Sequence, residues 1–498
     1  MLYLLKTLFV LDALMVIGLV LFRRALAPKN RGLVSGKIIA LALLTPAVAL
    51  FSGNLYIFCG YLVLAVAFNS RSRSELAATY VFLLPLMPLL SLQVGVGSVY
   101  LLAVSAVLAL NLGALIGLIA TSKSSTLTLG RYDLSFAAII ATFIFIYNRD
   151  ASLTSILRGF TVNIIEFGGP YLLISRALGT REDIEWLLTR LCLGGTLTAI
   201  TAVFQARWHW IVFEAYYQSL HVPLPMLSAS LSLRAGLMRT GGSIVDYSSG
   251  GLFLASILAL MPFLRSQFRP IGFWIISLTL FAGLIASQSR GAWVAAIIGL
   301  LFVAAYRGLW GRMAVLAGGT IAVEAFILVF AKSGRLAQIA GQTDEATGTV
   351  SYRKLLATQG MDQIRNHPIL GQSPDQLVAN LPDLVQGQHI VDFVNGHLFI
   401  AMAAGIPLFL IWCVVWLMPI VDAWHRRRQA GNMMEAPAVI IVTALTALTF
   451  TSILDRNLTW PTLALGLAAP CIIVARRRIR AGDQAPERTN RVLKARLA

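Results

Sequence analysis

Long runs of apolar residues restrict the fold of this chain more than any other feature. A helix needs about 20 mostly apolar residues to cross a bilayer. About fifteen runs of nearly this length and composition follow one another along the 498 residues. They begin near residues 2, 35, 53, 78, 98, 134, 159, 187, 248, 271, 291, 313, 394, 436 and 459. Short polar connections separate most of them. This pattern is typical of a membrane protein and excludes a water-soluble globule.

The composition agrees with that interpretation, because 57% of the residues are hydrophobic and only 12% are charged. A soluble domain has roughly 45–50% apolar and about 25% charged residues. Within a bilayer only helices and closed barrels satisfy their backbone groups. The runs at 292–306 and 438–451 lack the alternation of barrel strands. We therefore predict an all-α polytopic integral membrane protein, a single membrane domain over 1–498 with roughly 12–15 transmembrane helices.

The positive charge lies in every second connection, which predicts the orientation. These connections and the basic tail at 476–498 hold 27 basic and 9 acidic residues, a difference of +18, whereas the remainder holds 13 of each sign. Basic loops stay in the cytoplasm, so we expect the N-terminus outside and the C-terminus in the cytoplasm. The net charge of +18 is thus explained by topology, and no nucleic-acid partner is expected.

Two long connections fall on the predicted outer side, at 207–247 and 332–392. The second contains a stretch with helical spacing of apolar residues from Tyr352 to Ile364, and Pro368 and Gly371 follow it. We therefore expect an amphipathic helix beside the outer mouth of the bundle. The first apolar run lacks a basic start and a small-residue cleavage site, so we expect it to remain as a helix.

Common catalytic motifs are absent from the sequence. It contains no phosphate-binding GxxxxGK[ST], no HExxH and no GxSxG, so ATP-driven transport and the common hydrolases lack support. The four cysteines lie inside apolar runs, where a buried, inert thiol is expected. No cluster has metal-ligand spacing, so we predict metal independence and no cofactor.

Arginines at the predicted outer face are the first group of candidate site residues, because an ionisable group there is costly unless it is used. Ser289 and Arg290 form a tight turn between two apolar runs, and an Arg can hold a phosphate with two N–H groups. Arg234 and Arg239 stand beside glycines whose backbone N–H groups could approach an anion. Arg353 begins the amphipathic stretch. Snorkelling, a helix cap or a solvated charge is the ordinary structural alternative in each case.

Acidic, amide and imidazole groups at two helix starts are the second group. Asp246 precedes the helix near residue 248, and Asp392, Asn395 and His397 open the helix near 394. Asp and Asn commonly cap helix starts, whereas a His at such a mouth is a candidate general base.

Four of these motifs, in this order, resemble the superfamily of O-antigen ligases and polysaccharide polymerases (Wzy/WaaL type). The match covers about residues 234–415. It rests on Arg-x-x-Gly before a helix, on Ser289-Arg-Gly-Ala-Trp, on Arg353-x-x-Leu with Ile364-x-x-x-Pro-Ile-Leu-Gly, and on Asp392-x-Val-Asn with Gly405-Ile-Pro-Leu. Ligase-type members tend to carry a His where this chain has Val394, so the motif looks more like that of exopolysaccharide polymerases.

The resemblance implies a glycosyltransferase of the bacterial inner membrane that joins oligosaccharide repeat units. The N-terminus and the two long loops would then lie in the periplasm. The donor would be a glycan on a polyprenyl (undecaprenyl) diphosphate, and the acceptor the sugar end of another such unit. Arg239, Arg290, Arg353 and Arg234 would bind the diphosphate, while Asn395 and Ser289 position the helix starts. His397 is the first candidate base, and Asp392 or Asp246 the second. Membrane lipids, a flippase and a chain-length regulator are the expected partners.

Two other functions compete with this one. An O-antigen ligase would share the donor chemistry and transfer the glycan to lipid A core. A transporter of lipid or polysaccharide would need ionisable residues near the mid-membrane and helices broken in matched pairs, and the few inward acids are Asp12, Glu166 and Glu324.

Overall fold

The computed structural model describes residues 1–96, 99–121, 130–224, 233–234, 236–330, 344–386, 390–427, 432–452 and 455–496. All fifteen apolar runs counted in the sequence correspond to helices. The first half contains α1 (Leu2–Ala25), α2 (Gly36–Phe51), α3 (Leu55–Ala67), α4 (Arg73–Leu83), α5 (Ala106–Ala120), α6 (Asp133–Asn148), α7 (Leu153–Ala177), α8 (Arg181–Trp208) and the short α9 (Glu214–Ser219).

The second half contains α11 (Tyr247–Leu264), α12 (Pro270–Ser287), α13 (Arg290–Tyr306), α14 (Trp310–Phe330), α16 (Asp344–Asn366), α17 (Pro374–Asn380), α18 (Gly396–Arg426), α19 (Glu435–Leu448) and α20 (Asp455–Arg496). Single 3₁₀ turns are η1 (Pro28–Leu33), η2 (Leu84–Leu86), η3 (Gly242–Ile244), η4 (Arg265–Gln267) and η5 (Pro382–Leu384). The strands are β1 (Ser91–Val96), β2 (Val99–Ser105), β3 (Leu233–Arg234), β4 (Leu237–Met238), β5 (Val385–Gln386) and β6 (Ile390–Val391).

The helical architecture confirms the predicted all-α membrane fold. In the described part of the chain, α1, α8, α12, α18 and the segments Tyr247–Gln267 and Asn457–Arg477 are long and apolar enough to cross a membrane. Shorter apolar helices of 10–17 residues accompany them. Large apolar side chains remain exposed on the outer helices, for example Phe9 and Ile271 at 75% each. In a membrane such side chains contact lipid, so their exposure is expected.

The strands form three two-stranded antiparallel hairpins, and the first corrects the prediction for the run near residue 98. Its helix begins only at Ala106, because the preceding residues pair as β1 and β2. Ser91, Gln93 and Gly95 are exposed, whereas Leu92 and Val94 between them are partly buried. This period of two is the pattern of a strand. This alternation was missed in the sequence because the run as a whole is hydrophobic.

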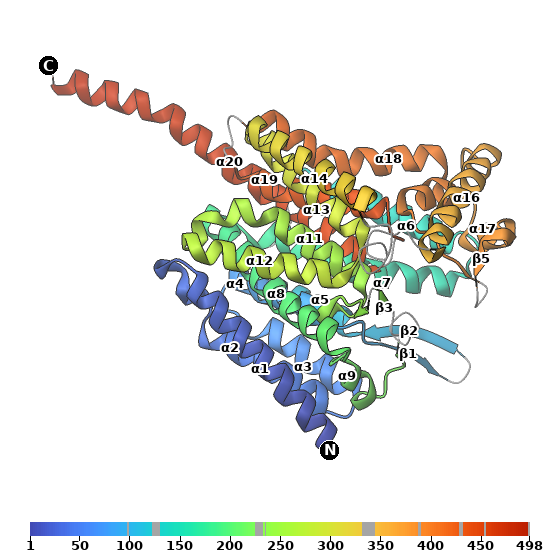
Figure 1. The fold of residues 1–498 in the computed structure, drawn as a ribbon. Helices are drawn as coiled ribbons and strands as arrows, with labels where there is room; N and C mark the ends of the chain where they lie inside the picture. Colours follow the sequence, from blue (N-terminus) through green and yellow to red (C-terminus); the bar gives the residue numbers. More distant parts are fainter. Residues whose placement is uncertain are drawn as a thin grey trace.

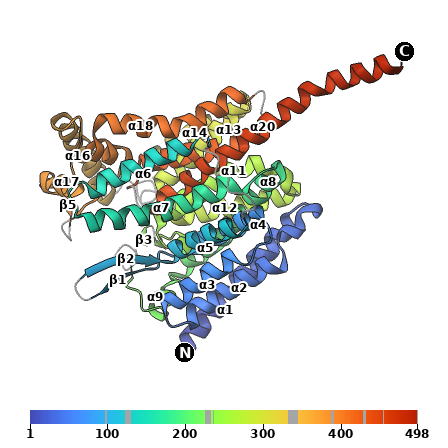
Figure 2. The ribbon, with the colours of Figure 1, turned by 180° about the vertical axis from the view of Figure 1, so that it is seen from behind.

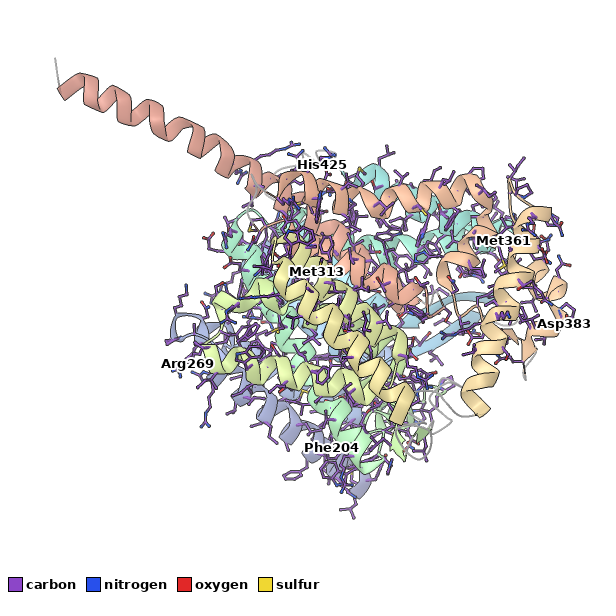
Figure 3. The ribbon with its side chains drawn as sticks, turned by 45° about the horizontal axis from the view of Figure 1, so that its top comes forward. Phe204, Arg269, Met313, Met361, Asp383 and His425 are labelled. Carbon is purple, nitrogen blue, oxygen red and sulfur yellow. The ribbon has the colours of Figure 1, made fainter. Side chains whose placement is uncertain are left out.

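The two ends of the bundle differ in structure. At one end, here called the loop end, lie the β1–β2 hairpin, α9, β3, α16 and α17 (Figures 1 and 2). The opposite end, called the basic end, contains η4, the connection from α13 to α14, and the C-terminal end of α18. Figure 3 shows the same polarity, since Arg269 and His425 lie far from Met361 and Asp383. Beyond the basic end, α20 continues as a helix to Arg496 and projects from the bundle.

The second long connection folds against the loop end. The predicted amphipathic helix is confirmed as α16, which ends at Asn366 just before Pro368. Leu356, Leu381, Leu384 and Val391 form a small apolar core of their own, against which Val394 and Leu398 pack. This core attaches α16 to the start of α18.

Candidate functional site

The four sequence motifs converge on a segment that sequence reasoning did not select, the connection between α19 and α20. The backbone N–H of Gly396, at the start of α18, donates to Thr451 O at 3.0 Å. The Thr451 hydroxyl lies 2.8 Å from the Ser248 hydroxyl in the first turn of α11. Arg353 Nη2 donates to Phe450 O at 3.1 Å. We call residues 449–452 the junction, because it brings the starts of α11 and α18 together with α16.

The junction also contacts the start of α13, where Arg290 lies. A Cβ atom added to Gly291 would lie only 2.5 Å from Phe450 Cβ, so α13 and the junction pack closely. The turn before Arg290 is tight, since Gln288 has a positive φ of 49°. Ser289 occupies the N-cap position of α13, and its side chain makes no capping hydrogen bond. Trp293 of the same motif donates its indole N–H to Leu284 O at 3.0 Å, which joins α13 to α12 across the turn.

Arg239 lies next to this turn. The Thr240 N–H donates to Ala286 O at 3.4 Å, which joins the strand-like segment after β4 to the end of α12. The Arg239 guanidinium lies over the Tyr247 ring, 3.6 Å from its centroid. A cation–π contact of this kind holds the guanidinium in place and keeps its charge. Arg239 and Arg290 therefore flank the same α12–α13 turn from two different segments.

The glycines after Arg239 do not have the role expected from the sequence. We expected their N–H groups to approach an anion, but Gly241 N donates to Val245 O and Gly242 N donates to Thr240 Oγ1, at 3.3 and 3.0 Å. An added Cβ on Gly241 would lie 2.7 Å from the carbonyl carbon of Asp246. Gly241 and Gly242 instead allow the backbone of this segment to pack closely against α8 and α11.

Backbone strain marks the same segment. Val245, a β-branched residue, has φ 70° and ψ −56°, and Asp246 N donates across it to Ile244 O at 2.9 Å. A γ-turn with a positive φ at its central residue is rare and costs about 1–3 kcal/mol. Strain of this size persists only where the surroundings fix it, and it sets the direction in which α11 begins.

Two of the acidic and amide residues predicted at the helix starts, Asp246 and Asn395, cap those helices. The Asp246 carboxylate accepts the Ser249 N–H at 2.6 Å, and Asn395 Oδ1 accepts the Leu398 N–H at 3.1 Å. Both side chains therefore occupy N-cap positions and accept a backbone N–H. For Arg234 the structure describes the backbone in β3, and its side chain lies outside the described residues.

Asp392 and Arg353 influence each other's pKa at the loop end. Arg353 is the cation that most lowers the pKa of Asp392, although burial outweighs it and raises that pKa above its ordinary value. Burial likewise lowers the pKa of Arg353, and Asp392 partly offsets the change. The Tyr352 hydroxyl donates to the backbone carbonyl of Asp392 at 2.9 Å. Asp392 is thus a carboxylate of raised basicity held beside α16.

His397 is engaged on both sides of its ring. Its Nε2 lies 2.9 Å from Leu445 O, a distance at which Nε2–H donates to the carbonyl. The indole N–H of Trp412 points at Nδ1 from 3.5 Å, and Trp412 is buried. The ring therefore ties the start of α18 to α19.

A break in α18 holds the loop end against the bundle. Gly405 has φ 77° and ψ 171° inside the helix, which frees backbone groups for residues 368–372. Ile406 N donates to Pro368 O at 2.8 Å, and Gln372 N donates to Met402 O at 2.9 Å. We call these contacts the clasp. They explain the Pro-Ile-Leu-Gly and Gly-Ile-Pro motifs, which are structural here.

Arg149, between α6 and α7, completes the clasp and was not selected from the sequence. Its guanidinium donates to Leu370 O at 2.7 Å, Gly371 O at 3.3 Å and Ala403 O at 3.3 Å. The freed carbonyls of a broken helix need such partners. No local pattern could reveal this role, because its partners lie more than 220 residues away.

The junction was missed for a related reason. Thr451, Ser452 and Asn457 are ordinary polar residues at the end of an apolar run, and their sequence context predicts only a turn. Asn457 is fully buried and donates to Ser452 O at 2.9 Å. The burial of Asn457 marks this segment as important, and burial cannot be read from the sequence. Among the described residues, no group of three or more His, Cys, Asp or Glu side chains could hold a metal ion.

Comparison with known proteins bears on the family resemblance. Residues 275–413 match the family model described as O-antigen ligase. This part of the chain is therefore similar to O-antigen ligases, which confirms the resemblance predicted from the motifs. The matched segment includes Arg290, Arg353, Asp392 and His397, whereas Arg239 and the junction lie outside it. No curated protein matches the chain.

Proposed function

We propose that this protein polymerises lipid-linked oligosaccharide repeat units at the periplasmic face of the bacterial inner membrane. The observation that carries the proposal is the junction, which gathers Arg290, Arg353, Asp392 and the start of α11 at one end of a family-matched membrane bundle. The loop end faces the periplasm in this proposal, because the basic end carries the excess of Lys and Arg.

The arginines bind the donor diphosphate and stabilise the leaving group. Breaking the glycosyl–phosphate bond leaves negative charge on the polyprenyl diphosphate. Preorganised donors aimed at such developing charge contribute on the order of 10²–10³ in rate each. Arg239 and Arg290 flank the α12–α13 turn and supply these donors, with Arg353 and Arg234 on the neighbouring segments. No step of this chemistry calls for a metal ion or a cofactor.

Asp392 accepts the proton of the acceptor hydroxyl. A base must have a free lone pair near the acceptor, and both ring nitrogens of His397 already contact Leu445 O and Trp412 Nε1. The Asp246 carboxylate is used as a helix cap. The raised pKa of Asp392 makes it a stronger base than an ordinary carboxylate, and the charge of Arg353 favours its ionised form. His397 then positions the start of α18.

Polymerase is favoured over ligase by the surroundings of Val394. Ligase-type members tend to carry a His at this position, and here Val394 packs against the small apolar core of Leu356 and Leu381. This site therefore lacks the titratable group of the ligase motif. A ligase would otherwise use the same donor chemistry with lipid A core as acceptor.

The experiment supplies the purified protein with short polyprenyl-diphosphate-linked repeat units and follows the products by gel. A ladder of lengths supports the polymerase, whereas a single transfer that occurs only with lipid A core present supports the ligase. Neither product would refute both. Asp392→Asn should abolish the ladder and His397→Gln should retain most of it. Asp362→Asn on the same helix as Arg353 is the matched control, since Asp362 is exposed and, among the described residues, pairs with Arg365 alone.

A further inference from the structure

A cavity of about 480 Å³ opens at the basic end, opposite the proposed active site. It lies between the starts of α8 and α12 and the ends of α11 and α13. Three arginines from three different segments line it, namely Arg181, Arg265 and Arg307. Phe268 and Phe273 form part of its apolar wall. A cavity with convergent cations and an apolar wall suits an amphipathic anion.

The arginines keep donors available. Arg307 uses Nε and Nη2 in a two-pronged pair with Glu435, both at 2.7 Å, and Arg181 uses Nε to bind Glu185 at 2.7 Å. Their remaining guanidinium N–H groups make no hydrogen bond to the described residues. Arg265 stacks over Phe273, 5.1 Å from the ring centroid, and forms no ion pair within the described part of the chain. Glu185 and Glu435 neutralise two of the three arginines, so the lining keeps one excess positive charge.

An exposed apolar stripe leads away from this cavity along α12. Ile271, Trp274, Leu278 and Phe281 are 75%, 60%, 63% and 50% exposed. Their spacing of three and four residues places them on one face of the helix. The stripe begins at Ile271, next to Pro270 on the cavity wall, and continues along α12 for about three turns. Such a face would lie along an acyl chain whose head group occupies the cavity.

We propose that this cavity binds the phosphodiester head group of an anionic phospholipid, with one acyl chain lying along the exposed face of α12. Guanidinium groups bind phosphate oxygens with two parallel N–H donors. Basic cavities between transmembrane helices commonly hold acidic head groups. The proposal is independent of the sugar chemistry at the loop end, because the two sites lie at opposite ends of the bundle.

The test measures lipid retention by native mass spectrometry of the purified full chain after exchange into mixed phosphatidylglycerol and phosphatidylcholine. Wild type should retain phosphatidylglycerol preferentially. Arg265→Gln should weaken that retention about fivefold, the factor that corresponds to ~1 kcal/mol for one basic residue near an anionic surface. Arg269→Gln is the matched control, since it removes the same charge from the same connection and Arg269 does not line the cavity.

Three outcomes would overturn the proposal. The first is equal retention of the two phospholipids by wild type. The second is an equal loss of phosphatidylglycerol in Arg265→Gln and Arg269→Gln, which would indicate a diffuse charge effect. The third is displacement of the lipid by inorganic phosphate at equal concentration, which would reduce the site to one for a free anion. Replacing Trp274 and Leu278 by Ser should weaken lipid retention and leave any binding of inorganic phosphate unchanged.

Discussion

Replacing Gly405 by Ala should open the clasp and stop polymer synthesis without touching any proposed site residue. The backbone at Gly405 has φ 77° and ψ 171°, a region that is essentially restricted to glycine. An added Cβ would lie 2.5 Å from the carbonyl carbon of Ile369, and a backbone atom cannot rotate away. The substitution therefore forces either the helix break or residues 368–372 to move.

The size of the effect follows from the strain added to the closed clasp. Holding Ala in a glycine-only conformation costs about 1–3 kcal/mol. The hydrogen bonds from Ile406 N and Gln372 N are lost on opening in both proteins, so they cancel in the comparison. The strain of about 1–3 kcal/mol therefore raises the ratio of open to closed clasp by at least about fivefold. Because α16 is attached through this clasp, Arg353 should leave the junction when it opens.

Hydrogen exchange at residues 368–372 and 403–406 measures the opening directly, and the length ladder measures its consequence. Both should change in Gly405→Ala, and Arg149→Gln should change both in the same direction by less. Gly348→Ala on α16 is the control, since an added Cβ there meets nothing within 4 Å. Unchanged exchange in Gly405→Ala would refute the packing argument. Faster exchange with normal polymer would refute the coupling between clasp and site.

Three further predictions concern the charge at the site and the topology. Arg290→Ala should lower turnover about 10²–10³-fold with membrane insertion intact, and Arg290→Lys should recover only part of it, as steady-state rates will show. Activity should rise with pH as Asp392 ionises; Arg353→Gln removes the charge that lowers the pKa of Asp392, so the acid limb of the pH–rate profile should move to higher pH. A membrane-impermeant maleimide applied to whole spheroplasts should label Gly348→Cys and spare Gly32→Cys, and the opposite result would reverse the orientation.

The sequence predicted the helices because their signal is local. Each apolar run is long enough to be recognised by itself. The run near residue 98 was misjudged at its start, where Gly95 and Gln93 alternate with valine and leucine in the β1–β2 hairpin. The arginine motifs were also visible, since an ionisable residue beside an apolar run is conspicuous. Arg149 and Thr451 were not, because their roles depend on partners at Leu370 and Gly396 that only the folded chain brings near.

The segment that matches the O-antigen ligase family ends at residue 413, yet the junction lies at 449–452. Transplanting the matched segment into a related membrane protein would therefore carry Arg290, Arg353 and Asp392 without the surface that aligns them. A chimera designed to change sugar specificity should take its C-terminal boundary beyond Asn457, so that the two halves of the site come from one parent. Its N-terminal boundary should likewise precede Arg239, because the α12–α13 turn and the segment before α11 are fitted to each other.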